Sequence, residues 1–331
     1  MDFIGKLIGL GATPTVLLSV FLICFIGYAI GSVKVKGLSL GTAGVFLFAL
    51  LFGYLCTLPG LANIPVLGKF HMADASDAKI SSFKFISNVG LVLFVTSVGS
   101  IAGPKFFRDL KKNAKSYLPM GVLIILMGAA VTVAFALIPG IGPAYATGVL
   151  SGALTSTPAF SASQGAIEAL LPEQLGLVSL GHAVAYPFGV IGVVLFVQIM
   201  PRILKADMSK ERRLITGASA AADKKKKPAK SLKELGEFGF GAFGLAVVLG
   251  ILLGSVKIPL SAKGFEGPCF SLGLTGGPLL MSLILAHFGR IGSVSLRAEE
   301  HALKAFREFG LMLFLVGAGV EGGVELVEQI A

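Results

Sequence analysis

The chain has 331 residues, of which 54% are hydrophobic and only 14% are charged. Soluble domains carry about 25% charged residues, so this composition excludes an ordinary water-soluble fold, and the mean hydropathy of +0.86 agrees. The 44 glycines follow no three-residue period, which excludes collagen, and glycine is frequent where membrane helices pack closely. The composition predicts an all-α polytopic membrane protein.

The formal net charge of +10 is concentrated in residues 202–236, which hold 11 Lys and Arg against 4 Asp and Glu. The four lysines at 224–227 imitate a nucleic-acid-binding patch. Between apolar segments, however, a basic stretch is typical of a cytoplasmic loop, because positively charged loops stay inside and attract anionic lipid headgroups. We therefore expect membrane lipids, and no nucleic acid, as partners of this linker.

A helix needs about 20 apolar residues to cross a bilayer. Apolar runs of suitable length occur at 14–32, 40–57, 85–103, 118–138, 145–170, 178–200, 237–256, 271–289 and 307–324. The chain start shows no signal-peptide pattern, so the first run is expected to remain as a span. We predict three parts: a first transmembrane repeat (1–201), a basic cytoplasmic linker (202–236) and a second, truncated transmembrane repeat (237–331).

Three sequence blocks occur in the same order before and after the linker. GSVK at 31–34 recurs at 254–257, SLGTAG at 39–44 corresponds to SLGLTG at 271–276, and NVGLVLF at 88–94 corresponds to EFGLMLF at 308–314. Internal repeats in an apolar chain are typical of secondary transporters. The first copy continues for about a hundred residues after its third block and the second for about twenty, so we expect the second half to be incomplete.

Charge also predicts an orientation. Basic clusters follow the first and third apolar runs and fill the linker; if all are cytoplasmic, the N-terminus lies outside and an odd number of crossings precedes the linker. Six runs precede it, so one does not cross. The candidate is 145–170, whose glycines, hydroxyls and Pro158 make a poor continuous helix. A broken span and a re-entrant hairpin both fit, and the second repeat would then run inverted to the first.

The sharpest chemical signal is the sequence Thr155-Ser156-Thr157-Pro158. Proline removes a backbone donor and interrupts a helix, and the N-terminus of a half-helix offers unpaired N–H groups and about half a positive charge, which suits a carboxylate. The three hydroxyls add donors and acceptors. We predict that these four residues bind a small anionic substrate within the membrane. The alternative is a proline kink whose hydroxyls bond only to the backbone.

Further polar residues extend this predicted site. Asn88 and Thr96 lie in the third apolar run and are expected to line the substrate path, because polar residues inside a membrane bundle are costly unless they are used. Tyr186 is expected to form either part of the cavity wall or part of an interfacial belt. Gly99 and Gly103 form a small-xxx-small pair, which indicates close helix packing.

Three titratable residues lie in or beside the apolar runs, and the first of them has two possible interpretations. His182 either relays a proton or binds a carboxylate, or it lies at headgroup level near a helix end, which is the interpretation we favour. Glu168 is expected to stand alone at a membrane interface. Glu321 is expected near a span end, with its carboxylate reaching water.

The sequence shows no recognisable set of catalytic residues. The chain contains no Walker loop, haem motif or HExxH sequence. The three cysteines, Cys24, Cys56 and Cys269, are not spaced for metal binding, and their odd number argues against a disulfide framework. We expect no enzymatic activity, no cofactor and no metal.

Several blocks resemble the aspartate:alanine exchanger family of bacterial membrane transporters. They are residues 90–94, 102–107, 152–159, 183–192, 276–280 and 307–314. The resemblance implies an inverted-repeat secondary transporter fold with broken helices, related to bile-acid and sodium/proton transporters. It also implies an antiporter that exchanges small carboxylates or amino acids across the bacterial inner membrane.

The chain departs from the family pattern in two places. The family carries a large soluble insert between its halves and a second Thr-x-Thr-Pro-Ala block late in the second half; this chain has a short basic linker and lacks the second block. We therefore expect a second membrane subunit that supplies missing helices, or else a homodimer that shares a site. The alternative functions are a non-transporting scaffold or regulatory subunit, and an ion channel.

Overall fold

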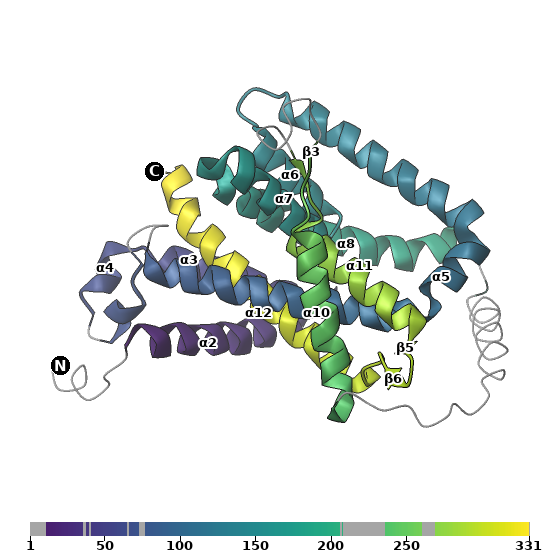
Figure 1. The fold of residues 1–331 in the computed structure, drawn as a ribbon. Coiled ribbons are helices and arrows are strands. Elements are labelled where there is room, and N and C mark those ends of the chain that lie inside the picture. The colour runs from purple at the N-terminus through teal and green to yellow at the C-terminus, as the bar shows by residue number, and fades with distance from the viewer. Residues whose placement is uncertain are drawn as a thin grey trace.

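The computed structural model describes residues 11–35, 38–39, 41–64, 66–72, 77–205, 207, 236–259 and 269–330. Within these ranges the chain is mostly helical (Figure 1), in agreement with the predicted all-α class. Most of the predicted linker at 202–236 lies outside the described residues.

The helices before the linker are α2 (Ala12–Ser32), α3 (Ala43–Cys56), α4 (Pro59–Ala62), η1 (Leu67–Phe70), α5 (Ala78–Ala136), α6 (Pro143–Ala153), α7 (Thr157–Leu170), η2 (Pro172–Gln174) and α8 (Leu175–Ile203). Those after it are η3 (Glu237–Gly239), α10 (Phe240–Gly254), α11 (Gly273–Phe288) and α12 (Glu300–Ile330).

In the described part of the chain, three short antiparallel ladders connect helices, and the apolar runs in the sequence did not indicate them. They pair β1 (Lys34–Val35) with β2 (Leu38–Ser39), β3 (Ile258–Pro259) with β4 (Cys269–Phe270), and β5 (Arg290–Ile291) with β6 (Val294–Ser295). The first ladder joins α2 to α3 and the second joins α10 to α11, so the order helix, ladder, helix occurs on both sides of the linker.

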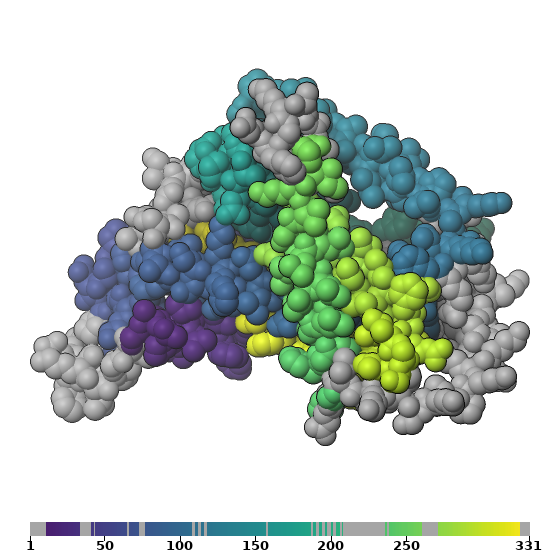
Figure 2. All heavy atoms as spheres, viewed as in Figure 1, coloured from purple at the N-terminus to yellow at the C-terminus, as the bar shows by residue number. Residues whose placement is uncertain are grey.

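Helix α5 carries two predicted spans in one continuous element of 59 residues that contains Pro104 and Pro119. The part after Pro119 runs back along the upper edge of the molecule (Figures 1 and 2). By length and composition, three stretches of the described chain are suited to cross a membrane: Ala12–Ser32, Ala78–Phe107 and Leu118–Ala136. In the last of these, 0% of the most apolar window is buried inside the protein.

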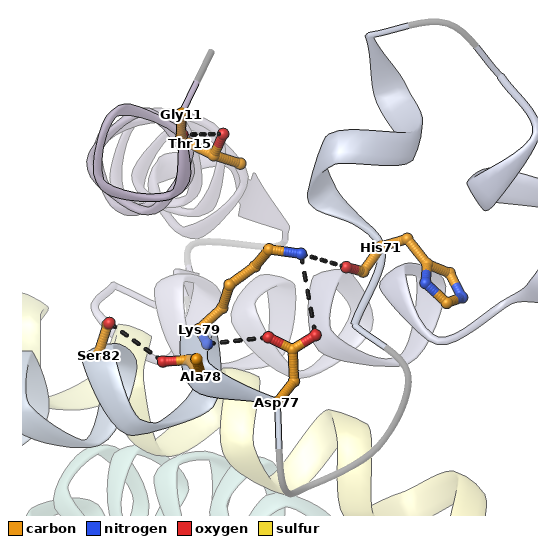
Figure 3. A network of polar contacts seen from close by, with 7 residues as sticks. All are labelled: Gly11, Thr15, His71, Asp77, Ala78, Lys79 and Ser82. Carbon is orange, nitrogen blue, oxygen red and sulfur yellow. Dashed lines mark hydrogen bonds and ion pairs between the residues drawn. The ribbon is translucent and has the colours of Figure 1, made fainter.

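A small polar network fixes the start of α5 (Figure 3). The Asp77 carboxylate accepts a hydrogen bond from the backbone N–H of Lys79 at 2.9 Å, which satisfies one of the free donors of the first turn. The Lys79 ammonium in turn donates to the backbone carbonyl of His71. The loop before α5 is thereby attached to the first turn of the helix.

Helices α5 and α12 cross at two glycines that leave no room for side chains. A Cβ atom on Gly90 would lie 2.6 Å from the Gly310 carbonyl oxygen, and one on Gly310 would lie 2.7 Å from the Gly90 carbonyl oxygen. Each glycine also touches the residue four positions beyond the other: Gly90 meets the Phe314 nitrogen and Gly310 the Phe94 nitrogen. The backbones of the two helices are therefore in direct contact, as only glycine allows.

Farther along its length, each of these two long helices also packs against a short helix from the other side of the linker. A Cβ on Gly99 of α5 would lie 2.6 Å from the Leu279 carbonyl oxygen of α11, and one on Gly319 of α12 would lie 2.9 Å from the Phe46 carbonyl oxygen of α3. A Cβ on Gly103 would likewise meet α11. The close packing predicted for Gly99 and Gly103 is confirmed.

The largest buried cluster combines residues from both sides of the linker. It includes Val20, Ile23, Phe46, Phe83, Leu91, Phe160, Phe314 and Leu315. Because α12 supplies part of this core, the first and second parts pack around shared side chains.

Candidate functional site

Helices α6 and α8 run in the same direction, with glycines between them. A Cβ on Gly148 would lie 2.2 Å from the Val178 carbonyl oxygen, and a Cβ on Gly189 would lie 2.6 Å from the Ala153 carbonyl oxygen. Helix α7 then leads back, through η2, to the first residue of α8. The 145–170 segment is therefore a hairpin, with both ends beside the start of α8, and the structure selects this alternative over a broken span.

The tip of this hairpin lies halfway along α8. The Cγ2 atom of Thr155 is 2.9 Å from the Cβ position of Gly189, and Gly189 is the fifteenth of the 29 residues of α8. A helix of this length measures about 43 Å at 1.5 Å per residue, enough to cross a hydrocarbon core of about 30 Å. The tip is thus level with the middle of a helix of membrane-spanning length.

The predicted helix break is confirmed at the hairpin tip. Helix α6 ends at Ala153 and α7 begins at Thr157. Thr155 has a φ of +49°, in the left-handed region that β-branched residues avoid. Ser156 caps α7, its Oγ accepting a hydrogen bond from the Ala159 N–H at 3.3 Å. Pro158 lies in the first turn of α7, where its missing N–H breaks no helical bond.

His182 lies inside the protein, so the predicted headgroup location is wrong. Its side chain is 0% exposed. The Nδ1 atom is 2.8 Å from the Ser151 Oγ of α6, and the ring stacks on Phe160 of α7 with centroids 4.1 Å apart. Phe46 of α3 approaches edge-on at 5.4 Å. The imidazole is held between the two arms of the hairpin, beside the break.

Hydroxyl groups from both sides of the linker reach the hairpin region. The Thr42 side chain, at the start of α3, lies close enough to Tyr186 of α8 to act on its phenol group. Thr275, near the start of α11, donates from Oγ1 to the Ser161 Oγ of α7 at 2.9 Å. The backbone nitrogen of Tyr186 also lies 2.9 Å from the Cβ position of Gly152, the glycine just before the break.

The predicted site residues fall into two groups. Around the hairpin tip and the adjoining stretch of α8 the structure places Thr155, Ser156, Thr157, Pro158 and Tyr186. The other two are on α5: Thr96 is fully buried, with no hydrogen-bond partner for its hydroxyl in the described part of the chain, and Asn88 is half-buried. No described hydrogen bond connects either of them to the hairpin.

Sequence reasoning missed three residues beside the tip, Ser151, Phe160 and Thr42, and one contact, which Thr275 makes with Ser161. The two threonines carried a usable signal, because both lie in the block that recurs across the linker. Ser151 and Phe160 carried none, because their importance depends on how α6 and α7 are rotated against α8.

A second polar cluster contradicts the expectations for Glu168 and Glu321. Glu168, at the end of α7, does not stand alone: its Oε1 forms an ion pair with the Lys84 Nζ of α5 at 2.5 Å. Glu321 of α12 is only 7% exposed, so its carboxylate does not reach water. The charges of Lys84 and Glu168 both act on it. This cluster connects the return arm of the hairpin to the crossing helices α5 and α12.

The unequal burial of these charges predicts unequal mutational effects. Glu168→Gln should change the free energy of unfolding by less than about 1 kcal/mol, because the Lys84–Glu168 pair is half-exposed. Lys84→Gln should cost more, about 1–3 kcal/mol, because it also removes the cation that acts on buried Glu321. Thermal unfolding in detergent measures both.

The double variant Lys84→Gln/Glu321→Gln provides the control. It should recover most of the stability that Lys84→Gln loses, since the buried acid on which the Lys84 charge acts is then absent. Equal effects of the two single variants would contradict the assigned role of Lys84.

The comparisons with known proteins identify the family of the chain. Residues 19–202 and 242–331 match the predicted permease membrane region of the aspartate–alanine exchangers. The chain therefore belongs to the aspartate–alanine exchanger family. The family model describes a permease membrane region, and the relatives it resembles are named as transporters.

Two curated relatives are uncharacterized transporters of Bacteroides. The chain is 36% identical to one from Bacteroides fragilis and 34% identical to one from Bacteroides thetaiotaomicron, each over 195 residues. These alignments cover 59% of this chain and 31% of each relative. The matched stretch thus spans about a third of the length of these relatives. No solved structure matches the chain.

Proposed function

We propose that the chain is the membrane part of a secondary transporter that exchanges small carboxylates or amino acids across the bacterial inner membrane. The observation that carries this proposal is the hydroxyl-bearing break of the α6–α7 hairpin, level with the middle of α8. Irregular backbone at membrane depth is tolerated where it is enclosed by protein or lines a cavity. Membership of a permease family supports the same class of function.

The proposed binding chemistry follows from the ends of the broken helix. The α7 N-terminus presents a partial positive charge toward the break, and Thr155 and Ser156 bring hydroxyls there. Ser161, bonded to Thr275, extends the hydroxyl surface by one turn along α7. A carboxylate at the tip would accept hydrogen bonds from these groups, while Asn88 and Thr96 of α5 are proposed to line the path to it.

We also propose that the parts on either side of the linker form an inverted repeat related through the Gly90–Gly310 contact. Glycines at equivalent positions of the recurring blocks support this: a Cβ on Gly31 would meet the Gly41 carbonyl oxygen, and a Cβ on Gly254 would meet the Gly273 carbonyl oxygen. Thr42 follows Gly41 by one residue and Thr275 follows Gly273 by two, and both reach the hairpin region. Such repeats with a central site are common in secondary transporters, including the bile-acid and sodium/proton transporters to which we propose the fold is related.

Orientation and partners belong to the same proposal. The N-terminus is placed outside and the 202–236 linker in the cytoplasm, as the positive-inside rule requires. Lipid covers the exposed apolar stretch Leu118–Ala136. Because the curated relatives are about three times longer than the matched stretch, we propose that a second membrane subunit, or a second copy of the chain, completes the transporter.

Reconstitution into liposomes tests this function. Labelled aspartate, alanine or succinate should enter only when an unlabelled counter-substrate is inside, either with this chain alone or after addition of the protein encoded by a neighbouring gene. Steady current without a counter-substrate would instead indicate an ion channel. Absence of exchange in every combination would support a scaffold and contradict the proposal.

A further inference from the structure

The imidazole of His182 leaves one ring nitrogen without a partner. His182 is 0% exposed, and its Nε2 atom makes no hydrogen bond within the described part of the chain. An unsatisfied buried polar group costs about 1–3 kcal/mol. The unpaired Nε2 lies beside the helix break. We take its cost as a sign that this nitrogen binds a molecule that enters the break.

The hydrogen-bond network assigns the role of Nε2. Ser151 has one hydroxyl hydrogen, and it donates this hydrogen to the Gly148 carbonyl oxygen at 2.7 Å. We therefore assign Nδ1–H as the donor in the 2.8 Å contact between Ser151 Oγ and His182 Nδ1, the tautomer that lets Ser151 keep its bond to Gly148. In a neutral imidazole the remaining nitrogen carries no hydrogen. Nε2 is therefore an unprotonated hydrogen-bond acceptor, and no donor of the described residues bonds to it.

The surroundings of the ring determine which donor it can take. The groups that face it are Ser151 of α6, Phe160 of α7, Phe46 of α3 and, from its own helix α8, Tyr186, the one titratable group among them. From α12, Phe314 packs against Phe160 in a T-shaped arrangement. No charged side chain of the described residues acts on the imidazole. A proton on Nε2 would therefore create a buried cation without a protein counter-ion.

We propose that His182 is a proton-binding site whose Nε2 takes up a proton together with the anion that occupies the helix break. This inference rests on the proposed function of the break. The proton comes from water on the side from which the anion enters; an N–H bond forms at Nε2, and the imidazolium donates it to an oxygen of the anion. The anion supplies the missing counter-charge, and the face of Phe160, on which the ring stacks, accommodates the cation.

Coupling of this kind has a quantitative signature. If one proton binds with each anion, the affinity for the anion rises about tenfold for each unit by which pH falls, over the range where free His182 is neutral. The slope of log affinity against pH is then about −1. In His182→Asn, whose amide can still donate to Ser151 but does not titrate, the slope should be close to 0.

The experiment uses the full chain in lipid nanodiscs and in proteoliposomes, with aspartate and succinate as probes. Protein labelled with ¹⁵N-histidine should show, without added anion near neutral pH, an imidazole protonated at Nδ1 only. This signal is assigned to His182 by its loss in His182→Asn. Addition of aspartate or succinate at pH 6 should convert it to the doubly protonated form. His301→Asn, which removes an exposed histidine at the start of α12, is the matched control and should leave the signal unchanged.

Two results would overturn the inference. One is a proton on Nε2 before any anion is added; the other is a neutral ring that stays neutral at pH 6 with either probe. In proteoliposomes, wild-type exchange that moves no protons, or that keeps its pH slope in His182→Asn, would also overturn it while leaving the transporter proposal intact. Failure of all exchange would count against the transporter proposal alone, because the nitrogen spectrum still decides whether His182 binds a proton with an anion.

Discussion

Replacement of Gly90 by alanine is expected to destabilise the protein by roughly 1–3 kcal/mol, the usual cost of overpacking. The new Cβ would lie 2.6 Å from the Gly310 carbonyl oxygen and 2.5 Å from the Phe314 nitrogen. Both are backbone atoms, so no side chain can rotate away and α5 must separate from α12. Thermal unfolding in detergent, followed by loss of the monodisperse size-exclusion peak, measures the effect.

Gly121 provides a matched control on the same helix. A Cβ there meets nothing within 4 Å, so Gly121→Ala should keep or raise stability, by up to about 1 kcal/mol, through its better helix propensity. Gly310→Ala should reproduce the loss seen for Gly90→Ala, since the two glycines contact each other. Equal stability of Gly90→Ala and Gly121→Ala would contradict the close crossing.

The features that sequence predicted well are local or periodic. The apolar runs predicted the helices, and the Thr-Ser-Thr-Pro stretch predicted the break between Ala153 and Thr157, because proline acts on its own turn. The spacing of Gly99 and Gly103 predicted a helix contact, although not that α11 would fill it. In each case the physical cause lies within a few residues of the signal.

The features that sequence missed depend on contacts between distant residues. His182 and Ser151 are 31 residues apart, and Lys84 and Glu168 are 84 apart. Their pairing is set by the rotation of packed helices, which hydrophobic periodicity does not specify in chains that are apolar on all sides. The continuity of α5 was missed for another reason: the basic residues at 105–115 read as a loop, yet they are good helix formers.

The α6–α7 hairpin combines features encoded by local sequence with features set by contacts between distant residues. Its break follows from local sequence, but its position halfway along α8 follows from Gly148, Gly152 and Gly189, which let the backbones of α6 and α8 touch. Glycine thus sets the depth of the break, and the hydroxyls and His182 set its chemistry. A variant that changes chemistry without changing packing is therefore the most informative test of the site.

Thr155→Val is such a variant, and it is expected to lower the affinity for aspartate or succinate about tenfold to a hundredfold. The change removes one hydroxyl but keeps the size and branching of the side chain. A hydrogen bond to a charged group contributes about 1.5–3 kcal/mol, and 1.4 kcal/mol corresponds to tenfold in affinity. Stability should hardly change, because valine and threonine are equally strained at a φ of +49°.

Two further substitutions separate backbone strain from hydroxyl chemistry. Thr155→Gly relieves the left-handed strain, about 1–2 kcal/mol, but lacks the hydroxyl, so it should be more stable than the wild type and yet bind weakly. Thr155→Asn tolerates the same conformation and retains a polar group, so it should gain stability and keep most of the affinity. Thermal unfolding and counterflow of labelled aspartate measure the two quantities in the same preparations. If affinity instead rises and falls with stability across Val, Gly and Asn, then Thr155 only shapes the turn, and the anion does not bind to its hydroxyl.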